Sequence, residues 1–138
     1  MTTFRRFAFA SCLAGSVGLA PDAEAKIRVV ATLQEYAWAA SAVGGDLVDA
    51  VALCPSDQDA HSLTPRPSHA VEVGRADIFI ETGLDLETWA PILLEKAGNA
   101  RVMPGAEGWV KAAEGVPLLD APTAIDRSRG DVHIYGNP

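Results

Sequence analysis

The sequence predicts an α/β fold, a Rossmann-like lobe with a mostly parallel four-stranded sheet and helices on both faces. Three observations carry this prediction. Strand and helix patterns alternate between residues 26 and 103, the strand patterns are apolar or β-branched runs, and glycines end two of the three helical patterns. Four strands that alternate with three helices are typical of a parallel sheet covered on both sides.

The first predicted strand is KIRVVATL at residues 26–33, which is rich in β-branched residues. A helix is predicted at 34–45, because apolar residues recur there with helical spacing and two glycines follow. The run LVDAVALC at 47–54 predicts a buried strand. The apolar stripe of the predicted helix consists of Tyr36, Ala39, Ala40 and Val43.

The second half of this region repeats the alternation. Residues 68–76 follow a proline and predict a short helix. The run DIFIETGL at 77–84 is the clearest strand, because three large apolar residues are contiguous in it. A helix is predicted at 88–98, where Gly98 ends it, and ARVM at 100–103 predicts a short fourth strand.

The first 25 residues have the layout of a secretory signal peptide. Arg5 and Arg6 form a basic start, an apolar run follows, and a small-x-small site ends at Ala25. The apolar run is short for a membrane span. Cys12 suggests a lipoprotein, but it lies too close to Arg6 to leave an apolar region before it. We therefore expect cleavage after Ala25 and export to the periplasm.

The predicted domain organisation is a signal peptide at 1–25, an α/β lobe at 26–103 and an irregular tail at 104–138. The tail is rich in Gly, Pro and Asp, and it has only a short apolar patch. It is either a disordered tail or the part of a larger protein that precedes a connecting helix and a second lobe.

Charge and cysteine content narrow the function classes. The formal net charge of −7 argues against nucleic acid and anionic membranes as partners and is compatible with a cation. After the predicted cleavage only Cys54 remains. An intramolecular disulfide is then impossible, so we expect Cys54 to be buried at the end of its strand.

The loop CPSDQDAHSLTPRPSHA at residues 54–70 carries the candidate ligand His61. It leaves the carboxyl end of the second predicted strand, where parallel sheets gather their ligands. Neutral imidazole is a common ligand of zinc and related metals. Asp57 and Asp59 could ligate a metal, orient the ring or only solvate the loop. A lone loop histidine is more often a surface residue, and this chain contains no CxxC or HExxH motif.

Several motifs nevertheless occur in one order along the chain, and together they resemble the metal-specific (zinc and manganese) periplasmic solute-binding proteins of ABC transporters. The resemblance covers roughly residues 27–103, the N-terminal lobe of that family. The matching residues are Gly44, Gly45, Asp46, Asp59, His61, Ser62, Pro65, Pro67, Ser68, Ala76, Asp77, Gly83, Leu84, Glu87 and Trp89.

The resemblance implies that His61 is the first metal ligand. Pro65 and Pro67 would then stiffen the loop that holds it, because proline fixes φ. The chain departs from the family pattern at three positions, which are Ala60, Leu63 and His69. None of these removes the ligand, and we expect His69 to be a surface or capping residue.

The resemblance leaves two possibilities for a second histidine ligand. In one alignment Asp131-Val132-His133 stands for the family motif, and His133 is the ligand. In the other, Asn137-Pro138 begins the motif, and the ligand would follow Pro138. The family's remaining ligands belong to a second lobe, which this chain does not contain. Zinc prefers about four ligands, so one or two histidines would bind it weakly.

The function that the resemblance implies is capture of a divalent metal, Zn²⁺ or Mn²⁺, and its delivery to an ABC permease. Ligation by histidine favours Zn²⁺, whereas added carboxylates would favour Mn²⁺. The metal is the transported ligand, no reaction is catalysed and a monomer is expected. One alternative is a small extracytoplasmic metalloenzyme, with Asp57 or Asp59 as the base beside a metal-bound water. Another is a truncated lobe without a present function.

Overall fold

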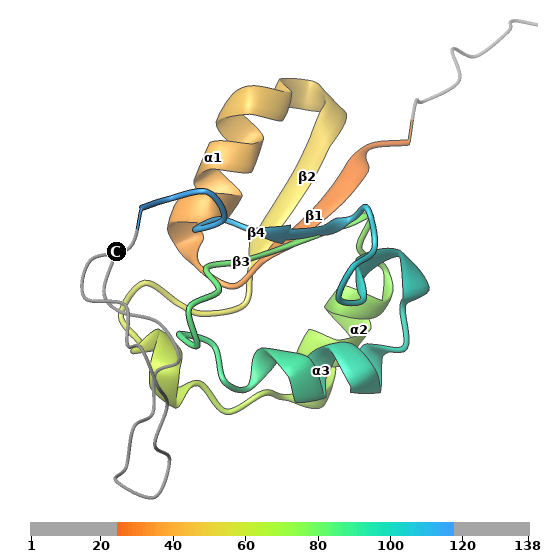
Figure 1. Cartoon of the computed structure of the whole chain (residues 1–138). Helices are drawn as coiled ribbons and strands as arrows, with labels where there is room; N and C mark the ends of the chain where they lie inside the picture. Colours follow the sequence, from red (N-terminus) through yellow and green to blue (C-terminus); the bar gives the residue numbers. More distant parts are fainter. Residues whose placement is uncertain (1–24, 118–138) are drawn as a thin grey trace, which may run out of the picture.

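The computed structural model describes residues 25–117, which form one parallel sheet with helices on both faces (Figure 1). The strands and helices are β1 Ile27–Ala31, α1 Gln34–Gly44, β2 Val48–Ala52, α2 Pro67–Gly74, β3 Ile78–Glu81, α3 Ala90–Ala97 and β4 Trp109–Lys111. Three short 3-10 turns separate them, η1 Gly45–Leu47, η2 Ala60–Ser62 and η3 Ala100–Val102.

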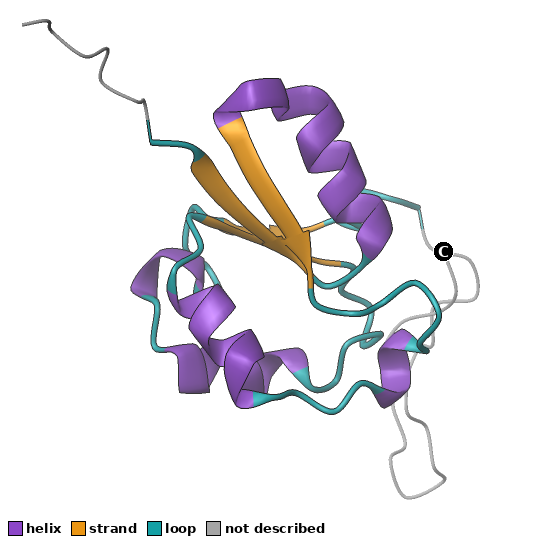
Figure 2. Ribbon diagram, turned by 180° about the vertical axis from the view of Figure 1, so that it is seen from behind, coloured by secondary structure: helices purple, strands orange, loops and turns teal. Residues whose placement is uncertain are grey.

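The strand order is β2-β1-β3-β4, and every pairing is parallel. Helix α1 covers one face of the sheet over β1 and β2, whereas α2 and α3 lie together on the other face (Figure 2). The predicted α/β class and the helices on both faces are therefore confirmed. The chain leaves β1 toward β2 and returns to β3 on its other side, so the strand order reverses between β1 and β3.

The core explains why the strand sequences are nearly continuous apolar runs. Val29 and Val30 point to opposite faces of β1, and they are 2% and 0% exposed. The core cluster lies on the side of α2 and α3. Its members include Val30, Leu53, Cys54, Leu63, Val73, Phe79, Trp89, Leu93, Leu94 and Val102.

The predicted fourth strand at 100–103 is wrong, because Ala100–Val102 forms η3 and Met103 follows it. Asn99 imposes the turn, since its Oδ1 accepts from the backbone N–H of Arg101 at 3.1 Å and its Nδ2 donates to the Ala76 carbonyl at 2.7 Å. The fourth strand is β4, which pairs with β3 and lies in the segment that was predicted to be irregular.

Helix α1 is confirmed, but the predicted apolar stripe is wrong in part. Tyr36 and Ala40 are partly buried as expected, while Ala39 is exposed and Val43 is 91% exposed. Ala37 is the buried residue of this helix instead. Tyr36, Ala37, Ala40 and Gly44 are the less exposed positions of α1, and they recur with helical spacing.

Residues 1–24 lie outside the described residues, so the predicted signal peptide, Cys12 included, stays a prediction. Within residues 25–117 no helix combines the length and the apolar character that crossing a bilayer requires.

Candidate metal site

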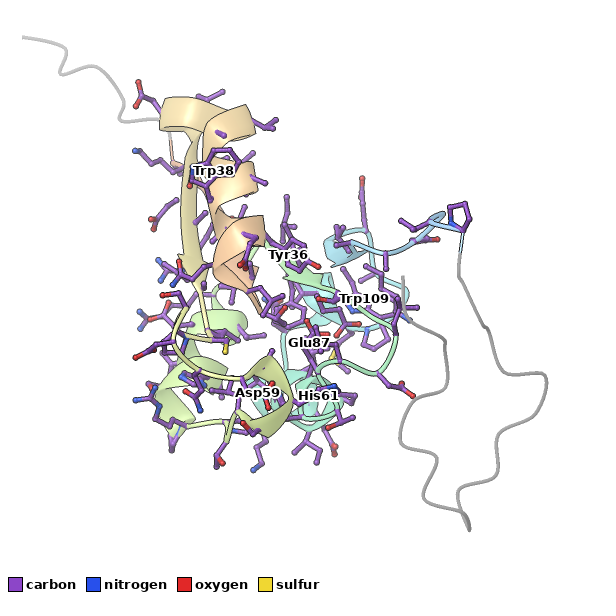
Figure 3. The ribbon with its side chains drawn as sticks, turned by 90° about the vertical axis from the view of Figure 1, so that its left-hand side faces the viewer. Tyr36, Trp38, Asp59, His61, Glu87 and Trp109 are labelled. Carbon is purple, nitrogen blue, oxygen red and sulfur yellow. The ribbon has the colours of Figure 1, made fainter. Side chains whose placement is uncertain are left out.

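The carboxyl edge of the sheet carries the candidate ligand. His61 lies in η2, in the long loop that connects the end of β2 to α2, as the sequence predicts. Its side chain is exposed. Figure 3 shows Asp59, His61 and Glu87 at the same end of the molecule, away from Trp38 on α1. An imidazole at this edge has the position that parallel sheets use for ligands.

Asp59 gives the His61 turn its shape. Its Oδ1 accepts a hydrogen bond from the backbone N–H of His61 at 3.1 Å. Its carbonyl oxygen accepts from the backbone N–H and from the hydroxyl of Ser62, each at 3.2 Å. The structure shows a role for Asp59 that the sequence did not suggest, which is capping of the turn.

Two contacts connect the turn to the core. Leu63, directly after η2, is 4% exposed and belongs to the core cluster. The indole N–H of Trp89 donates to the Ala60 carbonyl at 2.7 Å, from a position 29 residues away in the chain. Pro67 then begins α2 in its first turn, where a missing N–H costs nothing. The loop is therefore attached at both ends of η2.

His69 caps a helix and is not exposed. It is 7% exposed, and its Nδ1 accepts a hydrogen bond from the backbone N–H of Arg66 at 3.3 Å. The expected capping role is confirmed, whereas the surface position considered beside it is wrong. Burial, assisted by the charge of Arg66, lowers the pKa of His69 and favours the neutral imidazole that this bond requires.

Glu87 joins the ends of two strands beneath the site. Its Oε1 accepts from the Thr32 hydroxyl at 2.7 Å and from the Thr82 backbone N–H at 2.9 Å. These residues directly follow β1 and β3, so the carboxylate holds together the strands where the sheet order reverses. Its Oε2 is buried without a hydrogen-bond partner among the described residues. The sequence marked Glu87 only as a motif residue and gave no sign of this role.

The turn before Glu87 brings its carboxylate back to the sheet. Gly83, Leu84 and Asp85 have φ angles of 79°, 57° and 59°. Two successive non-glycine residues in the left-handed region are unfavourable, and the carboxylate bonds of Glu87 offset that cost.

A second buried carboxylate, Glu81, ends β3 and is 8% exposed. Burial raises the pKa of Glu81, and the nearby charge of Glu87 raises it further, while Lys111 acts in the opposite direction. Cys54 is buried as predicted, and burial raises the pKa of its thiol. Its Sγ donates to the Gln58 carbonyl at 3.4 Å, within the same loop.

The described part of the chain does not complete a metal site by itself. Among residues 25–117 no three His, Cys, Asp or Glu side chains lie close enough together to hold a metal ion. Asp57 and Asp59 therefore do not join His61 in a three-ligand group. The other predicted ligand, His133, lies outside the described residues.

Comparison with known proteins gives this arrangement a family context. Residues 29–138 match the family described as zinc-uptake complex component A, periplasmic (ZnuA). The chain is 25% identical over 116 residues to the iron ABC transporter substrate-binding lipoprotein MtsA of Streptococcus pyogenes serotype M1. It is 27% identical over 116 residues to the manganese ABC transporter substrate-binding lipoprotein PsaA of Streptococcus anginosus. Each alignment covers 81% of this chain and 36% of the relative, so the chain spans about a third of the relatives' length.

Solved structures agree with the fold. The metal-dependent lipoprotein YcdH of Bacillus subtilis is 26% identical with a TM-score of 0.57, over 69% of this chain and 34% of that one. A zinc-bound ZnuA deletion mutant gives a TM-score of 0.58 at 23% identity, over 70% and 35% of the two chains. A manganese-bound periplasmic metal-binding protein of Candidatus Liberibacter asiaticus gives 0.57 at 18% identity, over 71% and 35%. At these identities the last two show the fold alone.

Proposed function

The chain belongs to the family of periplasmic zinc-uptake components, and on that premise we propose that it binds a divalent metal ion outside the cytoplasm for delivery to an ABC permease. The family consists of metal-binding solute-binding proteins of transporters, and not of enzymes. The metal is the cargo, and this chain's part is to present ligands to it.

The observation that carries the proposal is the position of His61. It is exposed on a shaped turn at the carboxyl edge of a parallel sheet, next to the point where the strand order reverses. That edge is where α/β sheets bind ligands. Asp59 gives this turn its shape, since its Oδ1 accepts a hydrogen bond from the His61 backbone N–H at 3.1 Å.

Zinc is the proposed cargo, with manganese as the alternative. Imidazole suits zinc, whereas carboxylate-rich sites suit manganese. The relatives' names include iron and manganese, and the similar structures include zinc-bound and manganese-bound proteins. Our preference for zinc rests on His61, because the exposed candidate donor at the carboxyl edge is an imidazole.

We propose His133 as the second donor of this chain. The alternative is a residue that follows Asn137-Pro138 in a longer protein. Because the curated relatives are about three times as long as the matched region, further donors from a second lobe would complete the coordination. A partial donor set predicts weak binding by this chain alone.

Calorimetric titration of the 138-residue chain with Zn²⁺ tests the proposal. His61→Ala should lower the affinity by at least about tenfold, since even changes to residues that only orient ligands cost about 10–100-fold. His133→Ala should have a similar effect if His133 is the second donor. Asp57→Asn, in the same loop, serves as the control and should leave binding unchanged.

Equal zinc binding by wild type and His61→Ala would remove His61 from the site. A loss on His61→Ala without a loss on His133→Ala would instead favour a second donor beyond Pro138.

A further inference from the structure

The position of the His61 turn on the molecule depends on contacts with other elements as well as on the bonds within the turn. The bonds of Asp59 to His61 and Ser62 all lie within four residues, so they set the shape of the turn and not its position relative to the sheet. A metal ligand needs both, because a donor displaced by about an ångström no longer matches the metal's geometry.

Trp89 supplies a long-range bond to this turn. Its indole N–H donates to the Ala60 carbonyl at 2.7 Å, and the two residues are 29 apart in sequence. Ala60 immediately precedes His61 and packs partly buried against the core cluster. Because the acceptor is the backbone carbonyl of the residue before the ligand, this bond fixes the peptide plane from which His61 projects.

Trp89 is itself rigidly placed. Its side chain is 7% exposed within the core cluster, and its carbonyl accepts from the Leu93 backbone N–H at the start of α3. Glu87, two residues earlier, is held by the ends of β1 and β3. A short segment thus connects the carboxyl edge of the sheet to the His61 turn.

We propose that Trp89 is a positioning residue for metal binding, and that it acts by holding the Ala60 carbonyl and with it the orientation of His61. It touches no metal. This proposal deepens the proposed function and rests on it for the identity of the bound ion, but the placement of the turn can be measured without metal.

The test combines Trp89→Phe with Trp38→Phe as the matched control. Phenylalanine keeps an aromatic ring in the core and removes the indole donor together with part of the ring volume. Trp38 is 74% exposed on α1 and lies away from His61 (Figure 3). In the metal-free chain, amide hydrogen exchange of His61 and Ser62 should accelerate about tenfold in Trp89→Phe, as expected when one fixing hydrogen bond is lost. The core amides of Val30 and Phe79 should keep their rates, and Trp38→Phe should match the wild type throughout.

Zinc titration supplies the second readout. Trp89→Phe should weaken binding about tenfold, and this loss should disappear in the His61→Ala background, because both changes act through one donor. If His61→Ala abolishes binding but Trp89→Phe leaves it intact, the positioning role is wrong and the proposed function stands. If His61→Ala binds zinc as tightly as the wild type, the proposed function is wrong. The exchange experiment alone then decides whether Trp89 fixes the position of the turn.

A measurement on the wild type guards against a variant that fails to fold. The Trp89 indole proton should exchange at least about tenfold more slowly than that of exposed Trp38, because a buried hydrogen bond protects it. Equal exchange rates for the two indole protons would overturn the proposal.

Discussion

Two buried carboxylates at the carboxyl edge of the sheet, Glu81 and Glu87, have different electrostatic surroundings. Glu87 accepts two hydrogen bonds through Oε1, from the Thr32 hydroxyl and from the Thr82 backbone N–H. Glu81 is shielded from water and lies near the charge of Glu87, so its pKa is raised. At the scale of single residues, the edge therefore combines one carboxylate that builds the fold with another whose ionisation is disfavoured.

His69 gives the protein a pH-dependent contribution to stability. Its pKa in the folded state lies below its ordinary value, so the unfolded chain binds more protons as the pH falls. The contribution is complete above the ordinary pKa of about 6.5, and it is lost as the pH falls through the folded-state value. Urea unfolding at about pH 7.5 and 5.5 should show a larger loss for the wild type than for His69→Gln, whose side-chain oxygen can still accept from Arg66. Equal losses in the two proteins would contradict this role for His69.

At the scale of elements, the connection from β3 to β4 depends on Gly108, where the backbone lies close to that of Asp77 and Arg101. A Cβ at this position would clash with the backbone oxygens of Asp77 and Arg101. Gly108→Ala should therefore lower the free energy of unfolding by about 1–3 kcal/mol, as overpacking does. Gly74→Ala is the matched control, because its Cβ would make only an ordinary contact with the Ala97 carbonyl.

Chemical denaturation measures both variants. Gly74, at the end of α2, should tolerate alanine or gain slightly from it. A Gly108→Ala protein as stable as the wild type would show that β4 does not require this approach.

The elements that could be predicted from the sequence are those with a long, regular pattern. Strands β1, β2 and β3 are apolar runs, and α1 and α3 are followed by glycines, so their existence followed from periodicity. Strand β4 has three residues, of which only Trp109 is partly buried while the other two are exposed, and such a strand leaves no pattern. ARVM at 100–103 imitates a strand because Val102 is a buried core residue, although its backbone turns at Asn99.

The candidate site also has one part that the sequence predicted and another that it did not. His61 could be found because it belongs to a motif that the family resemblance preserves in order. The bonds of Trp89 to Ala60 and of Glu87 to Thr32 join residues 29 and 55 positions apart. Such contacts depend on how the elements pack against one another, and this packing cannot be predicted from the pattern of a single sequence. The sequence therefore predicted the position of the candidate ligand His61 but not the hydrogen bonds that support its loop.

At the scale of the whole molecule, the topology brings the site residues to one edge. The order β2-β1-β3-β4 places the loop after β2, the Thr32 end of β1 and the Thr82 end of β3 at neighbouring carboxyl ends. His61 lies in the first of these loops, and Glu87 connects the other two. A net charge of −7 adds a field that favours cations near the molecule. The molecule thus combines a family fold, a presented imidazole and a supporting segment.

The most direct test of the central claim is NMR of the histidine side chains during titration of the 138-residue chain with Zn²⁺. The account predicts saturable shifts of the His61 ring nitrogens, whereas buried His69, whose Nδ1 is occupied by the Arg66 N–H, should not respond. His69 is therefore an internal control in the same sample. Saturable zinc binding that leaves the His61 ring nitrogens unshifted would contradict the account.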